Sequence, residues 1–309
     1  RTNCVVTNDT PRRLGRLRGF FDIIATDMPC SGEGMFRKDE EAVRQWSPSL
    51  VAQCAARQRE IIADIWDALR PGGYLIYSTC TFNRQENEEI INHIIEEHGA
   101  ETVEIAVNPG WNISPGIVTA AHCYRFMQHR TRGEGLFIAV LRKPGQYQGC
   151  AVKAKKGKIL PVPKQCRSFV REDSGIVLTV DGTEVTARPI AIAQKMEAVR
   201  QNANTLLCGI PVASIKGKDL IPQHALALST ILNRKEFPEI ETDYNTAIAY
   251  LRGEAITPDS DAPRGYCLVT YRGYPLGWIK NLGNRANNCY PKEWRIRSAS
   301  TPETPPEVL

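Results

Sequence analysis

Over the first 140 residues, short runs of β-forming residues alternate with segments of helical periodicity. This alternation predicts βαβ units, and hence an α/β domain built around a mainly parallel sheet. We expect short buried strands over residues 4–7 and 21–26 (FDIIAT), because both runs are apolar and rich in β-branched residues or aromatics. Since a parallel pair needs a long crossover, the segment between two such strands has to contain a helix.

That crossover helix is predicted to begin at Pro48. Its expected apolar face recurs every three to four residues and is followed by Pro71-Gly72-Gly73, which should end the helix. The face comprises Leu50, Cys54, Ile61, Ile65 and Leu69. A strand over 74–78 and a helix over 86–98 come next, and 102–107 with 136–141 are expected to form a closing antiparallel pair.

The alternation stops after residue 141. Residues 142–166 combine Pro, Gly and six lysines with little periodicity, which predicts a linker. Asp181-Gly182 lies between two β-rich runs, 176–180 and 183–188, and predicts a hairpin. A helix over 189–203 follows, and the chain returns to strands at 266–271 and 276–280, with turns at Gly273, Gly277 and Gly283.

Cysteine spacing and charge exclude several classes of protein. The closest two of the ten cysteines are sixteen residues apart, so no paired zinc-ligand motif is present and we expect no metal site. No apolar run reaches the roughly 18 residues needed to cross a bilayer. Residues 1–150 contain 17 Lys and Arg against 18 Asp and Glu, whereas residues 151–309 contain 22 against 16. The second half is therefore the candidate for binding a polyanion.

Two cysteines follow the ends of successive predicted strands. Cys30 lies in Asp27-Met-Pro-Cys-Ser-Gly-Glu-Gly, and Cys80 lies in Ser-Thr-Cys-Thr after the next strand. Since parallel strands lie about 4.8 Å apart, side chains at their carboxyl ends can face one pocket. Either cysteine alone is most simply a core thiol, but two in polar, Gly-rich loops favour catalysis over that interpretation.

These two segments resemble motifs of a known family. DMPCSGEGMFRK and STCTFNRQENE are similar to motifs IV and VI of the Sun-type RNA cytosine-5 methyltransferases, and HRTRGEGLF resembles a later motif of that family. GYPLGWIKNLGNRANNCYPKEWRI resembles the PUA-like RNA-binding domain of the RsmF (YebU) branch, which modifies 16S ribosomal RNA. The resemblance implies S-adenosylmethionine as cofactor and ribosomal RNA, or the small ribosomal subunit, as partner.

The resemblance also implies roles for particular residues. Cys80 matches the nucleophile that attacks carbon 6 of cytosine, and Cys30 matches the cysteine implicated in releasing the covalent adduct. Asp9 and Asp27 match aspartates near the cofactor. Carbon 5 of cytosine is a poor nucleophile until a thiolate adds to the ring, so this chemistry is reasonable, and the target base has to be unpaired to reach the pocket.

RNA contacts are expected outside the pocket as well. Residues 265–297 contain six basic residues and one acidic residue, interleaved with aromatics, a composition that suits phosphates and unpaired bases. The candidate RNA-binding residues are Arg37, Lys38, Arg272, Lys280, Arg285 and Lys292. A solvated basic surface without a ligand is the alternative for each of them.

The resemblance has one clear gap. The Gly-rich cofactor loop of the family would precede Asp9, and no substitute occurs in the first 26 residues. We therefore expect a fragment of a longer enzyme that binds the cofactor weakly and is inactive alone. An RNA-binding or ribosome-assembly protein with a vestigial catalytic domain is the alternative, and a DNA cytosine methyltransferase fits less well, because its nucleophile belongs to the Pro-Cys motif.

The predicted architecture is therefore α/β. A Rossmann-like doubly wound methyltransferase domain, incomplete at its N-terminus, is followed by a small α+β module and a β-rich PUA-like domain. The expected limits are 1–145 for the first domain, 146–168 for a linker, 169–230 for the module, 231–300 for the PUA-like domain and 301–309 for a disordered tail. The reduced thiols and the RNA substrate predict a cytoplasmic protein that binds no DNA, membrane or metal.

Overall fold

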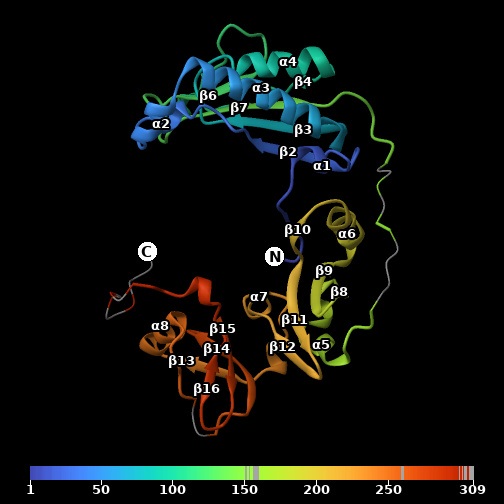
Figure 1. Cartoon of the computed structure of the whole chain (residues 1–309), viewed down its shortest axis with the longest axis vertical. Helices are drawn as coiled ribbons and strands as arrows, with labels where there is room; N and C mark the ends of the chain where they lie inside the picture. Colours follow the sequence, from blue (N-terminus) through green and yellow to red (C-terminus); the bar gives the residue numbers. More distant parts are fainter. Residues whose placement is uncertain are drawn as a thin grey trace. The chain divides into compact units, whose positions relative to one another are not determined.

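A computed structural model describes residues 1–149, 152, 154, 155, 160–258, 261–298, 300, 302 and 305. The chain forms two compact units (Figure 1). The N-terminal unit consists of residues 8–153 and 201–204, and the C-terminal unit consists of residues 1–7, 154–200 and 205–309. Much of the predicted linker and tail lies outside the described residues.

The N-terminal unit is a six-stranded sheet with helices. The sheet has the order β2-β3-β7-β6-β5, and β4 pairs with β7. The strands are β2 (Phe21–Asp27), β3 (Leu69–Thr79), β4 (Glu101–Thr102), β5 (Ser114–Pro115), β6 (Cys123–Phe126) and β7 (Leu136–Arg142). The helices are α1 (Pro11–Leu14), α2 (Glu40–Gln45), α3 (Pro48–Ile65) and α4 (Glu88–His98), with 3-10 turns η1 (Glu33–Met35), η2 (Trp66–Ala68) and η3 (Pro109–Trp111).

Strands β2 and β3 are parallel and joined through α3, as the alternation predicts, and β7 runs antiparallel to β3. Helix α3 begins where Ser47 Oγ accepts a hydrogen bond from Leu50 N, directly before Pro48. The predicted closing pair is present in short form, because Thr102 pairs with Leu141. The α/β class is thus confirmed, with β5 and β6 as strands that the pattern did not reveal.

Two details of the predicted helix are wrong. Its buried face consists of Val51, Ala55, Gln58, Ile62 and Ile65, shifted from the expected set because polar Gln58 interrupts the apolar pattern. The helix also ends at Ile65 rather than at Pro71-Gly72-Gly73. That tripeptide lies inside β3, where the ladder to β2 has an irregularity that accommodates the extra residues.

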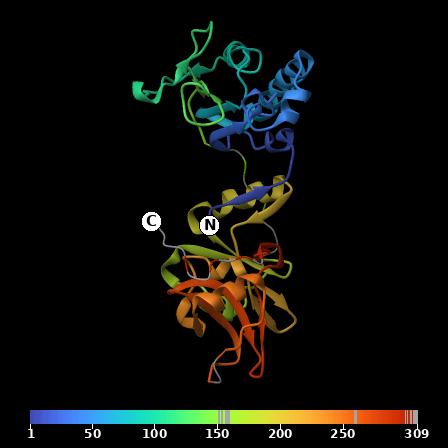
Figure 2. The same cartoon turned by 90° about the vertical axis from the view of Figure 1, so that its left-hand side faces the viewer.

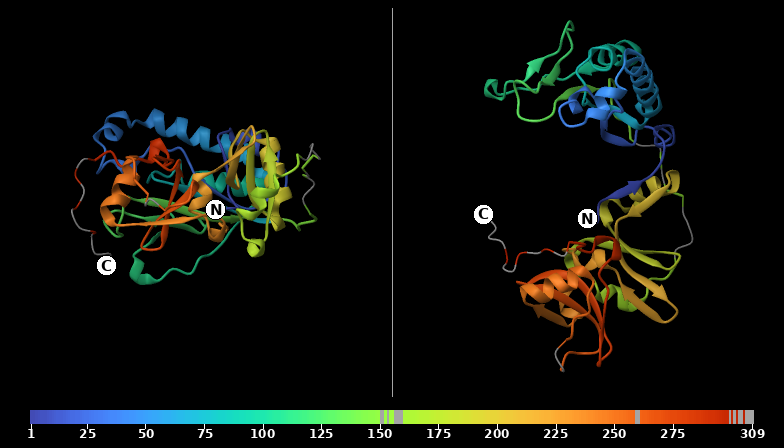
Figure 3. Two further views of the ribbon diagram at one scale, coloured as in Figure 1. Left: turned by 90° about the horizontal axis from the view of Figure 1, so that it is seen from below. Right: turned by 60° about the vertical axis from the view of Figure 1, so that its left-hand side comes forward.

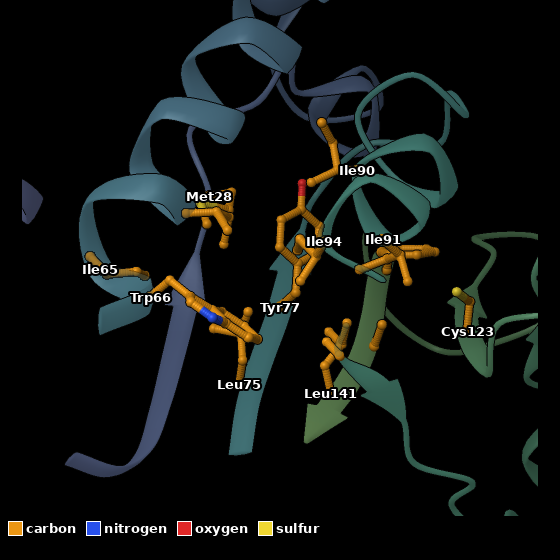
Figure 4. Packing of buried hydrophobic residues seen from close by; sticks show 14 of the residues in the cluster. Met28, Ile65, Trp66, Leu75, Tyr77, Ile90, Ile91, Ile94, Cys123 and Leu141 are labelled. Carbon is orange, nitrogen blue, oxygen red and sulfur yellow. The ribbon is translucent and has the colours of Figure 1, made fainter. Parts of the chain in front are cut away.

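The core of the N-terminal unit lies between the sheet and helices α3 and α4 (Figure 4). Ile65 and Trp66 extend from the end of α3, Ile90 and Ile94 come from α4, and Tyr77 rises from β3 between them. Burial of these side chains fixes both helices on one face of β3. The residues that follow β2 and β3 are thereby held in place next to one another.

The predicted strand over residues 4–7 forms elsewhere. It is β1 (Val5–Thr7), which pairs antiparallel with β10 (Thr205–Cys208) in a separate two-stranded sheet of the C-terminal unit. It is also less buried than expected, since the Val6 side chain is exposed. Its apolar, β-branched sequence fits a strand, but sequence alone does not reveal the pairing partner.

The C-terminal unit contains two four-stranded sheets, in the orders β12-β11-β9-β8 and β13-β14-β15-β16 (Figures 1 and 2). Its remaining strands are β8 (Ile176–Asp181), β9 (Glu184–Pro189), β11 (Ile210–Lys216), β12 (Asp219–Pro222), β13 (Glu239–Thr242), β14 (Gly265–Tyr271), β15 (Tyr274–Asn281) and β16 (Ala286–Asn288). Its helices are α5 (Lys164–Ser168), α6 (Ala193–Asn202), α7 (His224–Ala227) and α8 (Tyr244–Arg252). Its 3-10 turns are η4 (Glu172–Ser174), η5 (Ile190–Ile192), η6 (Arg234–Glu236) and η7 (Lys292–Trp294).

The hairpin predicted at Asp181-Gly182 is present, and the two strands predicted on either side of Gly273 also pair. Strands β8 and β9 pair around Gly182, and β14 and β15 pair around Gly273, with α8 against β14 (Figure 3). The turn predicted at Gly277 is wrong, because this residue lies inside β15. A side chain there would collide with the Tyr250 hydroxyl, so the glycine serves close packing and not a turn.

One hydrophobic cluster joins the two sheets of the C-terminal unit. It includes Val185 and Val212 of the first sheet together with Leu268 and Trp278 of the second. Trp278 Nε1 donates a hydrogen bond to the Gln223 carbonyl at 2.9 Å, which ties β15 to the preceding segment. The segments on either side of residue 230 therefore share a core, and the domain limits given above stay a prediction. Within the described residues no helix is both long and apolar enough to span a bilayer.

Candidate active site

The loops that follow β2 and β3 bring Cys30 and Cys80 together. Asp27 is in register with Ser78 at the ends of the two strands, and Met28 N donates to the Ser78 carbonyl at 2.9 Å. The two Sγ atoms lie 3.1 Å apart, and both cysteines are partly exposed free thiols. The predicted juxtaposition is therefore confirmed. It follows from parallel neighbouring strands that end at the same edge of the sheet.

The two thiols have opposite protonation tendencies. The hydrogen bond from Cys30 lowers the pKa of Cys80 to about 7, because it stabilises the Cys80 thiolate. The same bond is the largest cause of the raised pKa of Cys30, and burial adds to it. Near neutral pH the shared proton therefore resides on Cys30 Sγ, and Cys80 is the thiolate of the pair.

A buried carboxylate connects the two cysteine loops. Glu86 is fully buried, and its Oε2 accepts hydrogen bonds from Ser31 N at 2.9 Å and from Gln58 Nε2 at 3.1 Å. Its Oε1 accepts from Ser31 Oγ at 2.5 Å and from Asn83 Nδ2 at 2.7 Å. Four donors around one carboxylate offset the cost of burying its charge. Glu86 thereby fixes Ser31, beside Cys30, relative to the segment that follows Cys80.

A second carboxylate connects the same loops closer to the surface. Glu33 Oε2 accepts from Phe82 N at 2.7 Å and from Asn83 N at 2.8 Å. Between the two carboxylates, Gly34 N donates to the Cys80 carbonyl at 2.8 Å. A Cβ on Gly34 would lie 2.7 Å from that carbonyl oxygen, so only glycine permits this approach.

Behind the loop of Cys80 lies a buried ion pair. Arg125 of β6 donates to Glu88 through Nε at 2.6 Å and through Nη2 at 2.5 Å, and both side chains are almost fully buried. Arg125 Nη1 also donates to the Phe82 carbonyl at 2.7 Å. The pair therefore holds the backbone two residues after Cys80.

Of the predicted cofactor residues, only Asp27 lies at this site. Its exposed carboxylate is on the last residue of β2, and its charge raises the pKa of Cys80, against the larger lowering by Cys30. Asp9 instead accepts from Asn204 N at 2.6 Å and from Thr10 N at 2.9 Å, and it pairs with Arg13. The Asn204 bond is the largest cause of the lowered pKa of Asp9. Within the described residues Asp27 forms no ion pair, and an exposed carboxylate beside the cysteines has the charge that complements a cationic sulfonium.

Arg37 and Lys38 lie near the loops. Arg37 Nη2 and Lys38 Nζ contact Glu134 Oε1 at 2.9 and 3.0 Å, and both side chains remain more than half exposed. Glu134 belongs to the segment HRTRGEGLF singled out in the sequence. The pairing orients two cations beside the site, and their predicted role in RNA binding stays a prediction.

The predicted RNA-binding residues of the C-terminal unit fall into separate places. Arg272 is in the β14–β15 turn, whereas Lys280 lies near the far end of β15 and Arg285 lies in the turn to β16. The cross-strand partner of Lys280 is Tyr266, which lies six positions before Arg272. At the rise of a β-strand this is a distance of about 20 Å. Lys292 begins the short helix η7. The four cations therefore do not form one compact cluster.

Sequence reasoning missed several positioning residues, although some signals were present. Gln58 is a polar residue within the apolar stripe of a helix, which marks a buried polar contact. Glu33 and Glu86 lie inside the two motifs that were recognised for their cysteines. Arg125 gave no signal, because its partner Glu88 comes from a distant segment. No group of three or more potential metal ligands occurs in the part of the chain that the structure describes.

Residues 2–142 match the family 16S rRNA methyltransferase RsmB/F, and residues 237–296 match the methyltransferase RsmF PUA domain. The chain is 30% identical over 305 residues to ribosomal RNA small subunit methyltransferase F of Klebsiella pneumoniae (strain 342), covering 94% of this chain and 62% of that protein. It is 33% identical over 310 residues to the protein of the same name from Escherichia coli O7:K1, covering 94% and 63%. The chain thus spans about three fifths of the length of these curated relatives.

Among solved structures, the chain is similar to NSun6 from Pyrococcus horikoshii with SFG. The identity is 31%, the match covers 44% of this chain and 33% of that one, and the TM-score is 0.38.

Proposed function

We propose, on the premise that residues 2–142 match the family 16S rRNA methyltransferase RsmB/F and residues 237–296 match the RsmF PUA domain, that this chain methylates carbon 5 of a cytosine in small-subunit ribosomal RNA with Cys80 as nucleophile. The observation that carries the proposal is the pair of thiols 3.1 Å apart at the ends of two neighbouring parallel strands, and the lowered pKa of Cys80 beside the raised pKa of Cys30 supports it. A catalytic thiolate next to a protonated thiol is the arrangement that this chemistry needs.

Cys80 performs the first step. With a pKa of about 7, roughly half of the Cys80 side chains are thiolate at neutral pH. The thiolate adds to carbon 6 of the cytosine, and the electron pair of the carbon 5–carbon 6 double bond makes carbon 5 nucleophilic. Gly34 N holds the Cys80 carbonyl and Glu33 holds the backbone of Phe82 and Asn83, so that the sulfur is oriented before the base arrives.

Cys30 acts in the release of the adduct. Its pKa is raised chiefly by the bond to Cys80, and this cause disappears once Cys80 Sγ is bonded to carbon. Cys30 then ionises more readily and can accept the proton from carbon 5. The electron pair of that C–H bond re-forms the double bond, and the carbon 6–sulfur bond breaks, which restores the Cys80 thiolate.

S-adenosylmethionine, when bound, supplies the electrophilic methyl group. Asp27 is the residue of this chain that would hold it at the site, because its carboxylate is exposed beside the cysteines and complements a positive charge. Asp9 already accepts two backbone hydrogen bonds and would have to exchange them for a ligand. Such a protein would act in the cytoplasm, where thiols remain reduced.

Trapping with RNA that contains 5-fluorocytosine tests the proposal, because fluorine at carbon 5 blocks the release step. The complete protein and its Cys54→Ala control, which removes a thiol on α3, should both form a stable protein–RNA adduct. Cys80→Ala should form none, and an adduct in that variant would refute the assignment of the nucleophile. With ordinary cytosine RNA, Cys30→Ala should accumulate adduct that the wild type releases.

The same assay separates the alternative function. An RNA-binding or assembly protein without catalysis would retain the labelled RNA in a native gel but give no denaturant-resistant band. If the complete protein, supplied with cofactor, gives this result, the alternative function replaces the proposed one.

A further inference from the structure

Two adjoining hollows lie on the surface of the C-terminal unit, with volumes of about 1030 and 530 Å³. The first is lined by α5, η4 and β8, and the second by the segment 227–235 and the start of β15. Arg171, Asn233 and Lys235 line both, so the two hollows form one continuous groove. We call it the α5–β15 groove. None of the RNA-binding residues predicted from the sequence lines it.

The groove is basic. Its lining contains five basic and two acidic side chains, and the ion pair of Arg171 with Asp173 neutralises one of each. Arg234 is engaged by Glu239 through two short contacts. The other three cations, Lys164, Arg167 and Lys235, are exposed and form no ion pair within the described part of the chain. Glu172 is the remaining acidic residue of the lining, so these three cations give a net surplus of two positive charges, which favours a polyanionic ligand.

An aromatic side chain stands at one end of the groove. Tyr274 is 76% exposed and lies at the first position of β15. The turn before it is held rigidly, because Arg234 Nη1 donates to the Gly273 carbonyl at 3.0 Å and Gly273 N donates to Glu241. A large, exposed ring on a backbone that is held in place is a stacking platform for an unpaired base.

We propose that the α5–β15 groove binds a single-stranded segment of the RNA substrate, with its phosphates at Lys164, Arg167 and Lys235 and one base stacked on Tyr274. An acidic peptide would satisfy the cations but would not use the ring. A duplex would use the cations but hide its bases. The inference rests on the proposed function only in taking the polyanion to be RNA.

The assignment adds a contact region outside the PUA-domain match, because all three cations precede residue 237, whereas Tyr274 lies within the match. A substrate bound there and at the cysteine pair would be recognised by two parts of the chain. The small module between the two matched domains would then have a direct role in RNA binding.

Binding of a fluorescein-labelled, unstructured 20-nucleotide RNA to the complete protein tests the groove. Lys164→Ala/Arg167→Ala/Lys235→Ala should weaken binding at least tenfold at 0.1 M salt, and the slope of log affinity against log salt should fall by about 2, since each phosphate contact on single strands contributes about 0.7. The matched control Lys195→Ala/Lys216→Ala/Lys218→Ala removes three exposed charges elsewhere in the same unit. Equal losses in the two triple variants would overturn the proposal.

The ring is tested separately. Tyr274→Ala should lose about five- to tenfold in affinity, whereas Tyr274→Phe should retain it, because stacking on an aromatic ring contributes about 1 kcal/mol or more per base. If Tyr274→Ala binds RNA as tightly as the wild type, the proposed recognition of a single strand is wrong. The same holds if oligoglutamate competes for the groove as effectively as unlabelled RNA.

The trapping assay keeps this proposal distinct from the catalytic one. At saturating RNA the triple groove variant should still form the 5-fluorocytosine adduct, because its substitutions lie outside the cysteine loops. If the wild type forms no adduct but the groove variants still bind RNA more weakly than the wild type, only the catalytic proposal is refuted.

Discussion

The cysteine loops of the N-terminal unit and the basic surface of the C-terminal unit are built in opposite ways. Around Cys30 and Cys80, buried carboxylates and amides hold the backbone through a dense set of hydrogen bonds, with Glu86 accepting four of them. Around Lys164 and Lys235, the side chains are exposed and few contacts orient them. The first region is preorganised and the second is adaptable.

This difference follows from what each region would do. Nucleophilic attack requires one sulfur in one position, so ordering is completed during folding. Phosphate binding requires only charge within reach, and flexible lysines supply it at little cost in stability. Single substitutions should therefore have large effects near the cysteines and small, additive effects on the basic surface.

The largest effect is expected at the ion pair behind the Cys80 loop. Arg125→Met leaves the Glu88 carboxylate buried without its partner and should lower the free energy of unfolding by about 3–5 kcal/mol. Urea denaturation measures the change. The double variant Arg125→Met/Glu88→Leu should recover most of the loss, because no unpaired charge remains. Failure of the double variant to recover would mean that the bonds that the two side chains make to the backbone, from Arg125 to the Phe82 carbonyl and from Ile117 N to Glu88, are more important than the ion pair.

Glu86→Gln should have the next largest effect. Each Glu86 oxygen accepts two hydrogen bonds. In Glu86→Gln, the NH2 group replaces one of these oxygens and therefore faces two donors in either orientation of the side chain. We expect a loss of about 2–3 kcal/mol in the free energy of unfolding, together with slower adduct formation. The control Glu60→Gln, an exposed carboxylate on α3, should change stability by less than about 0.5 kcal/mol. An unchanged adduct rate in Glu86→Gln would show that the cysteine loops do not depend on this carboxylate.

The pH dependence of adduct formation tests the coupling between the thiols. In the wild type the rate should rise with pH through about 7, because Cys80 loses its proton there. Cys30→Ala removes the hydrogen bond that lowers this pKa, so the rise should move toward the ordinary thiol value of about 8.5 and the rate at pH 7 should fall roughly 15-fold. Adduct rates measured between pH 6 and 9.5 decide this. A wild-type profile in Cys30→Ala would contradict the assigned proton position.

The smallest effects are expected on the PUA-domain surface. Lys280→Ala, Arg285→Ala and Arg272→Ala should each weaken RNA binding only a few-fold and reduce the salt slope by about 0.7. Because Arg272 lies far from the other two along the hairpin, its effect should add independently to theirs. Fluorescence anisotropy at several salt concentrations measures both quantities. Complete loss of binding in one single variant would break the contrast between the two regions.

Local sequence was informative where the pattern was strong and short-range. The β2–α3–β3 order, helix α4 and the two hairpins around Gly182 and Gly273 follow from periodicity and turn chemistry. Errors occurred where long-range contacts override those signals. Gly277 is a glycine because Tyr250 packs against it, and Pro71-Gly72-Gly73 is accommodated inside a strand.

The sequence by itself determined the two cysteine motifs and their place after successive strands, because a parallel pair joined by a helix leaves no other arrangement for the strand ends. Only the tertiary structure decided which residues hold those motifs and which strand β1 pairs with. The carboxylate of Glu86, the amide of Gln58 and the Arg125–Glu88 pair are matched across segments 28 to 55 residues apart. A hydrogen bond between such segments depends on packing that no local pattern encodes, whereas the period of a strand or a helix is a property of the local chain.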